Sequence, residues 1–161
     1  MGIVVGIEDL ERIVTDLHQD GRRISFANGH FDLLHVGHLR YLAAAKRHGD
    51  RLIVGINGDR SVERLKGKGR PLVPAVERAE LVAALEPVDF VVVFEEDSPS
   101  NLLTRLQPHV HCKGTDYGSP EKVPEYETVR SYGGQTALVG DPKDHSTQDL
   151  IAAIRNPDRA P

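Results

Sequence analysis

The sequence of 161 residues contains one cysteine, Cys112, so no internal disulfide can form. Few cysteines are typical of proteins in a reducing compartment. The N-terminus also lacks a basic leader and turns acidic at once, and no apolar run approaches the length of a membrane span. These absences predict a cytoplasmic protein with neither a signal peptide nor a membrane anchor.

A surplus of positive charge is missing as well. The chain has 20 Lys and Arg against 24 Asp and Glu, which gives a formal net charge of −4. Without a general attraction toward nucleic acid, any phosphate ligand must be held by a local site. Hydrophobic residues make up 39% of the chain, and its length suits one domain with a substantial core.

Several familiar ligand motifs do not occur. The sequence has no G-x-x-x-x-G-K-[ST] and no G-x-G-x-x-G after a strand, which excludes a P-loop and a dinucleotide fingerprint. A zinc site made of His30, Asp32, His35 and His38 is one possible reading of the histidines. The HExxH spacing is absent, however, and Gly37 suits a phosphate better, so we expect no protein-bound metal.

Apolar runs alternate with segments of helical spacing along the chain. The runs are continuous, as in strands that are buried on both faces, and this predicts a parallel sheet with helices on both sides. We therefore expect a Rossmann-like, three-layer α/β fold with about five strands. The predicted strands are 22–28, 50–57, 88–97, 109–114 and 135–140, and the predicted helices are 7–20, 36–49, 59–67, 75–87, 98–108 and 146–155.

No repeat or long linker divides the chain. The sequence thus predicts a single domain over 1–161. Its core is expected over about 22–155, with an N-terminal helix at 7–20 and a frayed tail at 156–161.

The segment 26–50, FANGHFDLLHVGHLRYLAAAKRHGD, joins a predicted strand to a predicted helix. Ligands of open parallel sheets bind outside the carboxyl ends of the strands, and helix N-termini attract anions. His35 and His38 are three residues apart, so both rings can lie on one side of the first helical turn. Two imidazoles at this place suit the charge that develops on a transferring phosphoryl group.

This stretch resembles the nucleotidyltransferase superfamily that is marked by a His-x-Gly-His motif, and within it the cytidylyltransferase-like group. The resemblance covers roughly 25–155 and continues through GINGD, VDFVVVFEED and HSTQDLIAAI. The stretches RLKGKGRP, FEED and KGTDY favour the subgroup that adenylylates D-glycero-β-D-manno-heptose 1-phosphate over the glycerol-3-phosphate cytidylyltransferases. In many bacteria such a domain is the C-terminal half of a bifunctional heptose kinase/adenylyltransferase; without a kinase segment, this chain is expected to be the stand-alone form.

The resemblance implies that AMP passes from ATP, with Mg²⁺, to the sugar 1-phosphate, giving ADP-heptose and pyrophosphate for lipopolysaccharide synthesis. It also implies a homo-oligomer, most simply a dimer, with small-molecule substrates and with no nucleic-acid or membrane partner. His30 departs from the family pattern, which usually has a small or apolar residue there, so a GTP-using enzyme stays open. A glycerol-3-phosphate cytidylyltransferase and a non-catalytic nucleotide-binding regulator also stay open.

The resemblance also assigns roles to individual residues. The residues expected to act on the phosphates in catalysis are His35, His38, Lys46 and Arg78. The residues expected to bind the nucleotide are Asn28, Gly29, His30, Phe31, Gly37, Lys113, Gly114, Asp116, Ser146 and Thr147. The residues expected at the sugar phosphate are Asp32, Lys66 and Arg70, and the loop that holds Lys66, Lys68 and Arg70 is expected to close as a lid.

Each role has an ordinary structural counterpart. Lys46 can be a solvated lysine near a helix end, and Arg78 can form a surface ion pair of little energetic value. Ser146 or Thr147 can simply cap the last helix. The remaining residues of interest are expected to be structural or at the surface, with the cysteine in the core: His18, His48, His109, His111 and Cys112.

Overall fold

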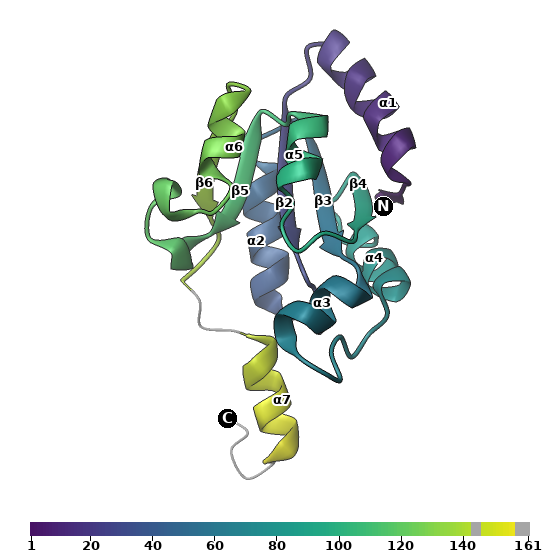
Figure 1. Cartoon of the computed structure of the whole chain (residues 1–161), viewed down its shortest axis with the longest axis vertical. Coiled ribbons are helices and arrows are strands. Elements are labelled where there is room, and N and C mark those ends of the chain that lie inside the picture. Colours follow the sequence, from purple (N-terminus) through teal and green to yellow (C-terminus); the bar gives the residue numbers. More distant parts are fainter. Residues whose placement is uncertain (143–145, 157–161) are drawn as a thin grey trace.

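The computed structural model describes residues 1–142 and 146–156 of the chain. Its centre is a six-stranded, wholly parallel sheet of order β1-β4-β3-β2-β5-β6 (Figure 1). The strands are β1 (Ile3–Val4), β2 (Ile24–Gly29), β3 (Arg51–Asn57), β4 (Phe90–Phe94), β5 (Val110–Gly114) and β6 (Gln135–Val139). From β2 the order runs outward through β3 and β4 on one side and through β5 and β6 on the other, so the topology reverses between β2 and β5.

Helices cover both faces of this sheet (Figure 1). The helices are α1 (Ile7–Gln19), α2 (Val36–Lys46), α3 (Asp59–Lys66), α4 (Ala75–Ala83), α5 (Ser100–Leu106), α6 (Tyr126–Ser131) and α7 (Thr147–Arg155). One apolar core lies between the sheet and α2 and α4, and a second lies between the sheet and α1 and α5. The predicted Rossmann-like α/β architecture is confirmed, with six strands in place of about five.

The strands form where the sequence is continuously apolar. Leu52, Ile53, Val54 and Ile56 of β3 are all fully buried, as a central strand with helices on both faces requires. The extra strand, β1, escaped prediction because it is only two residues long and both are exposed. It is held at the sheet edge by backbone bonds such as the one from the N–H of Ile3 to the oxygen of Asp89, at 2.9 Å.

The segment between β5 and β6 also differs from expectation. It holds two short 3-10 helices, Thr115–Tyr117 and Pro120–Lys122, and then α6, none of which was predicted. Each is too short to show a helical period in the sequence. Val129 of α6 is fully buried, so packing against the sheet stabilises this helix. The predicted tail at 156–161 lies outside the described residues beyond Asn156.

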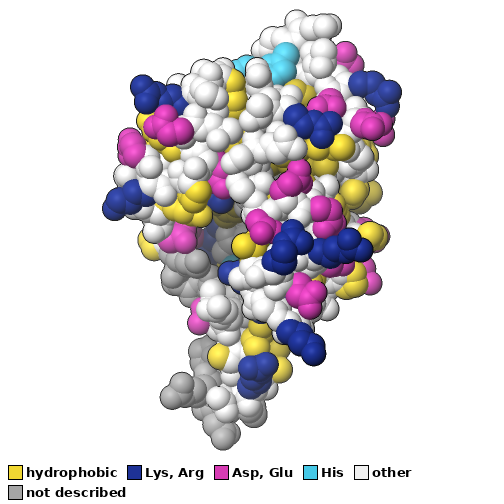
Figure 2. All heavy atoms as spheres, in the orientation of Figure 1, with side chains coloured by type: hydrophobic (Ala, Val, Ile, Leu, Met, Phe, Trp, Pro, Cys, Tyr) yellow, Lys and Arg dark blue, Asp and Glu magenta, His cyan; other side chains and the backbone are white. Residues whose placement is uncertain are grey.

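The surface carries charges of both signs. On the face shown in Figure 2, Lys and Arg side chains lie among Asp and Glu side chains rather than in a patch of one sign. Among the described residues, no helix combines the length and the apolar character needed to cross a bilayer.

Candidate active site

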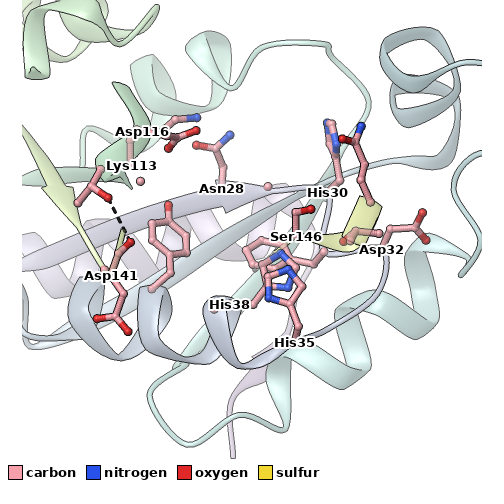
Figure 3. Close-up of a pocket in the computed structure, with 18 of the residues that line it drawn as sticks. Asn28, His30, Asp32, His35, His38, Lys113, Asp116, Asp141 and Ser146 are labelled. Carbon is pink, nitrogen blue, oxygen red and sulfur yellow. Dashed lines mark hydrogen bonds between the residues drawn. The ribbon is translucent and has the colours of Figure 1, made fainter. Parts of the chain in front are cut away.

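A pocket of about 550 Å³ opens at the carboxyl edge of the sheet, where β2 and β5 diverge. Its floor comes from the ends of these strands, and its walls come from the N-termini of α2 and α7 (Figure 3). The predicted residues that line it are Asn28, Gly29, His30, Phe31, Asp32, His35, Gly37, His38, Lys66, Arg70, Lys113, Gly114, Asp116, Ser146 and Thr147. Two predicted residues, Lys46 and Arg78, do not.

The loop from β2 to α2 shapes the floor of the pocket. Phe31 adopts a φ of 50° and is buried, so the chain turns sharply just after the strand. A Cβ atom at Gly29 would lie 3.1 Å from the Phe31 ring, which explains a glycine at this position. The turn brings the chain to His35, whose extended backbone (φ −143°) forms the N-cap of α2.

His35 and His38 stack against each other at the start of α2. Their ring centroids lie 3.8 Å apart with an interplanar angle of 27° (Figure 3). Burial lowers the pKa of His38 to about 4, and the neighbouring His35 acts in the same direction. His38 is therefore neutral without a ligand, and an anion in the pocket would favour its protonation.

His30 lies on another part of the wall, among cations. Burial lowers its pKa to about 4, and the positive charges of Lys66, Arg78, Lys113 and Arg70 act in the same direction. Of these cations, Lys66, Lys113 and Arg70 line the pocket themselves. These cations make the potential at His30 positive, which suits a phosphate group placed beside it.

Asp32 anchors the loop that follows α3. Its side chain accepts hydrogen bonds from Nε of Arg70 (2.7 Å) and from the backbone N–H groups of Leu72 (2.7 Å) and Val73 (2.9 Å). Only 4% of Asp32 is exposed, so the pair with Arg70 is largely desolvated. Asp32 thus contacts the loop that was expected to close as a lid, and this contact holds Arg70 at the pocket.

Arg78 requires a correction, because its guanidinium does not reach the pocket. The side chain is 0% exposed. It donates to the backbone oxygens of Val73 (2.8 Å), His30 (2.5 Å) and Asn57 (2.9 Å), and to the carboxylate of Asp59 (2.8 Å). Arg78 is therefore placed neither for a phosphate contact in the pocket nor in a surface ion pair. It joins the loop before α4 to the ends of β2 and β3.

Lys46 also lies away from the pocket. Eight residues of helix separate it from His38, which is about 12 Å at 1.5 Å per residue. Its ammonium group instead contacts the carboxylate of Asp89 (2.5 Å) and the backbone oxygen of Asp50 (2.7 Å). Asp50 and Asp89 precede β3 and β4, so Lys46 sits at the amino edge of the sheet, opposite the pocket. The prediction of a phosphate contact for Lys46 is wrong in this structure.

The start of α7 forms a second helix N-terminus at the pocket. Ser146 is its N-cap: Oγ accepts from the N–H of Asp149 (3.1 Å) and donates to that carboxylate (2.6 Å). Thr147 Oγ1 donates to the backbone oxygen of Leu33 (3.3 Å), which joins α7 to the loop before α2. The cap and the position at the pocket are both present, while a phosphate contact stays a prediction.

Several lining residues escaped the sequence reasoning: Tyr41, Thr115, Tyr117, Val139, Gly140, Asp141, Pro142, Gln148 and Asp149. Tyr41 had a usable signal, since it follows His38 by three residues and shares its helix face. Its hydroxyl donates to the backbone oxygen of Cys112 (2.7 Å), and burial raises its pKa well above the ordinary value. The remaining residues lie at or just after the ends of β5 and β6 or in α7, and a parallel sheet brings all strand ends to one edge.

The described residues contain no group of three or more His, Cys, Asp or Glu side chains arranged to hold a metal ion. In Figure 3, His30 and Asp32 lie away from the stacked pair of His35 and His38. Asp32 is held instead by its hydrogen bonds to the loop of Arg70.

An open parallel sheet whose pocket at the topological switch point is lined by histidines, lysines and two helix N-termini is typical of α/β proteins that act on phosphate-bearing ligands. The Cytidylyltransferase-like family profile matches residues 26–153, and the chain belongs to this family.

Curated relatives match almost the whole chain. The chain is 49% identical over 152 residues to the bifunctional protein HldE of Geotalea uraniireducens, and 49% identical over 154 residues to that of Rhodopseudomonas palustris. These matches cover 94% and 96% of the chain but 31% of each relative, so the chain spans about a third of their length.

Two solved structures resemble the fold. A lipopolysaccharide core biosynthesis protein from Thermoplasma volcanium superposes with a TM-score of 0.63 and 26% identity, covering 76% of this chain and 100% of that one. A pantoate-beta-alanine ligase from Francisella tularensis gives a TM-score of 0.62 at 14% identity, covering 96% of this chain and 77% of the ligase, and this likeness concerns the fold alone.

Proposed function

We propose that this chain is a nucleotidyltransferase that transfers AMP from ATP to D-glycero-β-D-manno-heptose 1-phosphate, which yields ADP-heptose and pyrophosphate. The observation that carries the proposal is the 49% identity to HldE proteins over almost the whole chain, which includes the pocket residues. The 26% identity to a lipopolysaccharide core biosynthesis protein supports the same area of metabolism.

In this mechanism an oxygen of the sugar phosphate attacks the α-phosphorus of ATP in line, and pyrophosphate leaves. A phosphate monoester is already anionic near neutral pH, so no side chain needs to act as a general base. The protein binds and orients the two anions and neutralises charge. His35 and His38, at the N-terminus of α2, donate hydrogen bonds to the phosphates of ATP, and the start of α7 takes the distal phosphates.

Lys66 and Lys113, which lie near His30, supply positive charge, and Arg70, held by Asp32, supplies more. We expect the loop of Lys66 and Arg70 to close over the substrates, which would exclude water from the reacting groups.

Mg²⁺ is expected to enter with the triphosphate. Asp116, Asp141 and Asp149 line the pocket but are not grouped as a metal site, so the phosphates would supply most of the ligands of this ion and a single carboxylate could add one more. When bound, the ion would neutralise part of the charge on the leaving pyrophosphate.

The test is a matrix of four nucleoside triphosphates against several sugar and polyol phosphates, with pyrophosphate release as the readout. We expect ATP with the heptose 1-phosphate to give the highest kcat/KM. A clear preference for glycerol 3-phosphate with CTP, or for GTP with the heptose, would change the substrate assignment but keep the reaction class. Nucleotide binding without pyrophosphate release from any pair would indicate a regulator instead.

We also propose that the chain acts as a single catalytic domain in the cytoplasm, where ATP is available. It is expected to form a homo-oligomer, most simply a dimer. Light scattering on the purified chain measures the oligomeric state directly.

A further inference from the structure

His111 is a buried histidine that takes no direct part in the proposed reaction. It lies on β5, is 0% exposed and does not line the pocket. Its neighbour across the sheet is Phe26, and their ring centroids lie 5.9 Å apart. A buried imidazole in an apolar core has a desolvation cost that a leucine would not have, and a hydrogen-bond partner offsets that cost.

That partner is Asn28, which does line the pocket. Nε2 of His111 lies 3.0 Å from Oδ1 of Asn28. The two side chains meet because Phe26 and Asn28 are two residues apart on β2 and share a sheet face with His111. Figure 3 shows Asn28 between His30 and the wall of Lys113 and Asp116. His111 therefore reaches the pocket only through Asn28.

The hydrogen bond fixes the state of both groups. Burial lowers the pKa of His111 to about 3, so its ring is neutral and carries a single N–H. A carbonyl oxygen can only accept, which places that proton on Nε2. Among the described residues, Nδ1 of His111 is buried and has no hydrogen-bond partner. An unpaired buried acceptor costs less than an unpaired buried N–H, so this tautomer is the favoured one.

We propose that His111 is a positioning residue: it holds the carboxamide oxygen of Asn28 and so presents the Asn28 NH₂ group to the pocket as a fixed donor for an acceptor atom of the bound nucleotide. Without His111, the amide can rotate and offer either its oxygen or its nitrogen to the ligand. This inference rests on the proposed function, because it takes the nucleotide as the ligand of Asn28.

Two substitutions of similar size separate this role from simple core packing. In His111→Gln the side-chain amide nitrogen can take the place of Nε2, whereas in His111→Asn it can take only the place of Nδ1. A third variant, His111→Leu, has no nitrogen at either position. We expect the Leu and Asn variants to raise the KM for ATP about three- to tenfold, the loss expected for one hydrogen bond. The Gln variant should stay near wild type, and the KM for the sugar phosphate should not change in any of them.

A double-mutant cycle with Asn28→Ala provides the decisive comparison. If His111 acts through Asn28, His111→Leu should have no further effect on the KM for ATP when Asn28 is already Ala. Additive effects would overturn the proposal, as would a normal KM in a folded His111→Leu variant. His109→Leu is the matched control, because His109 accepts from the backbone N–H of Ile24 (3.0 Å) and lies outside the pocket. It should lower stability and leave the KM unchanged.

The tautomer can be measured without any substrate. Imidazole ¹⁵N chemical shifts of the full-length chain should show His111 protonated at Nε2, and the Asn28 NH₂ resonances should shift in His111→Leu. Protonation at Nδ1 would overturn the inference. Because this readout needs no turnover, it separates a failure of the His111 assignment from a failure of the proposed reaction, which the substrate matrix tests on the wild-type protein.

Discussion

His35 and His38 form a stacked imidazole pair, with ring centroids 3.8 Å apart, at the first turn of α2. If they stabilise charge that grows as pyrophosphate leaves, their hydrogen bonds strengthen in the transition state. His35→Ala and His38→Ala should each lower kcat about 10²–10³-fold, with a smaller effect on KM. Steady-state kinetics measures this, with circular dichroism to check folding and the exposed His48→Ala as control. Near-normal kcat in both folded variants would contradict this role.

The depressed histidine pKa values predict how stability depends on pH. The pKa of His30 and of His38 is about 4 in the folded protein, against 6.5 ordinarily. Between these pH values both histidines are protonated in the unfolded chain but mostly neutral in the folded protein. The free energy of unfolding therefore falls as pH drops from 6.5 toward 4. Well above the ordinary value these two groups produce no pH dependence.

Urea denaturation at several pH values tests this expectation. The slope of unfolding free energy against pH should be shallower in His30→Gln and in His38→Gln than in wild type. The exposed His48→Gln serves as control and should leave the slope unchanged. Equal slopes in wild type and in both pocket variants would show that these histidines titrate normally.

The residues that follow β2 and open α2 were predictable from the sequence, whereas the surroundings of Lys46 and Arg78 were not. The segment after β2 had to reach the pocket, because all parallel strands end at one edge, and Asn28 to His38 lie there. Lys46 and Arg78 depend on tertiary geometry instead. Helical periodicity places Lys46 near the face of His38, but the helix rise also puts it about 12 Å farther from the pocket. No local signal shows that Arg78 is buried.

Lys46 forms an ion pair with Asp89 at the edge of the sheet opposite the pocket. Lys46→Met should therefore leave kcat and both KM values within about twofold of wild type. It should cost about 1 kcal/mol of stability or less, since both side chains are partly exposed. Lys113→Met, at the pocket, is the matched comparison and should raise the KM for ATP. A large loss of kcat in Lys46→Met would support the phosphate contact that the sequence predicted for Lys46.

Arg78 is expected to matter for folding rather than for ligand contact. Arg78→Met leaves the backbone oxygens of His30 and Asn57 without their donor, and should destabilise the protein by about 3–5 kcal/mol. Arg78→Lys keeps the charge but not the planar set of donors, so it should be intermediate. Thermal and urea unfolding measure both, with the exposed Glu77→Ala as control. A stable Arg78→Met variant that has lost only ATP binding would support the predicted phosphate contact of Arg78 instead.

The N-terminus of α7 faces the pocket beside α2. Replacing Ser146 and Thr147 together by Ala removes the cap to Asp149 and the contact with Leu33, and should cost on the order of 1 kcal/mol of stability. If these residues hold the distal phosphates, affinity for ATP should fall more than affinity for the sugar phosphate. Separate calorimetric titrations of the two ligands measure this difference. Thr104→Ala, which removes a side-chain bond to Ser100 within α5, is a control for helix destabilisation alone. Equal losses for both ligands would mean that the start of α7 supports the fold without binding the triphosphate.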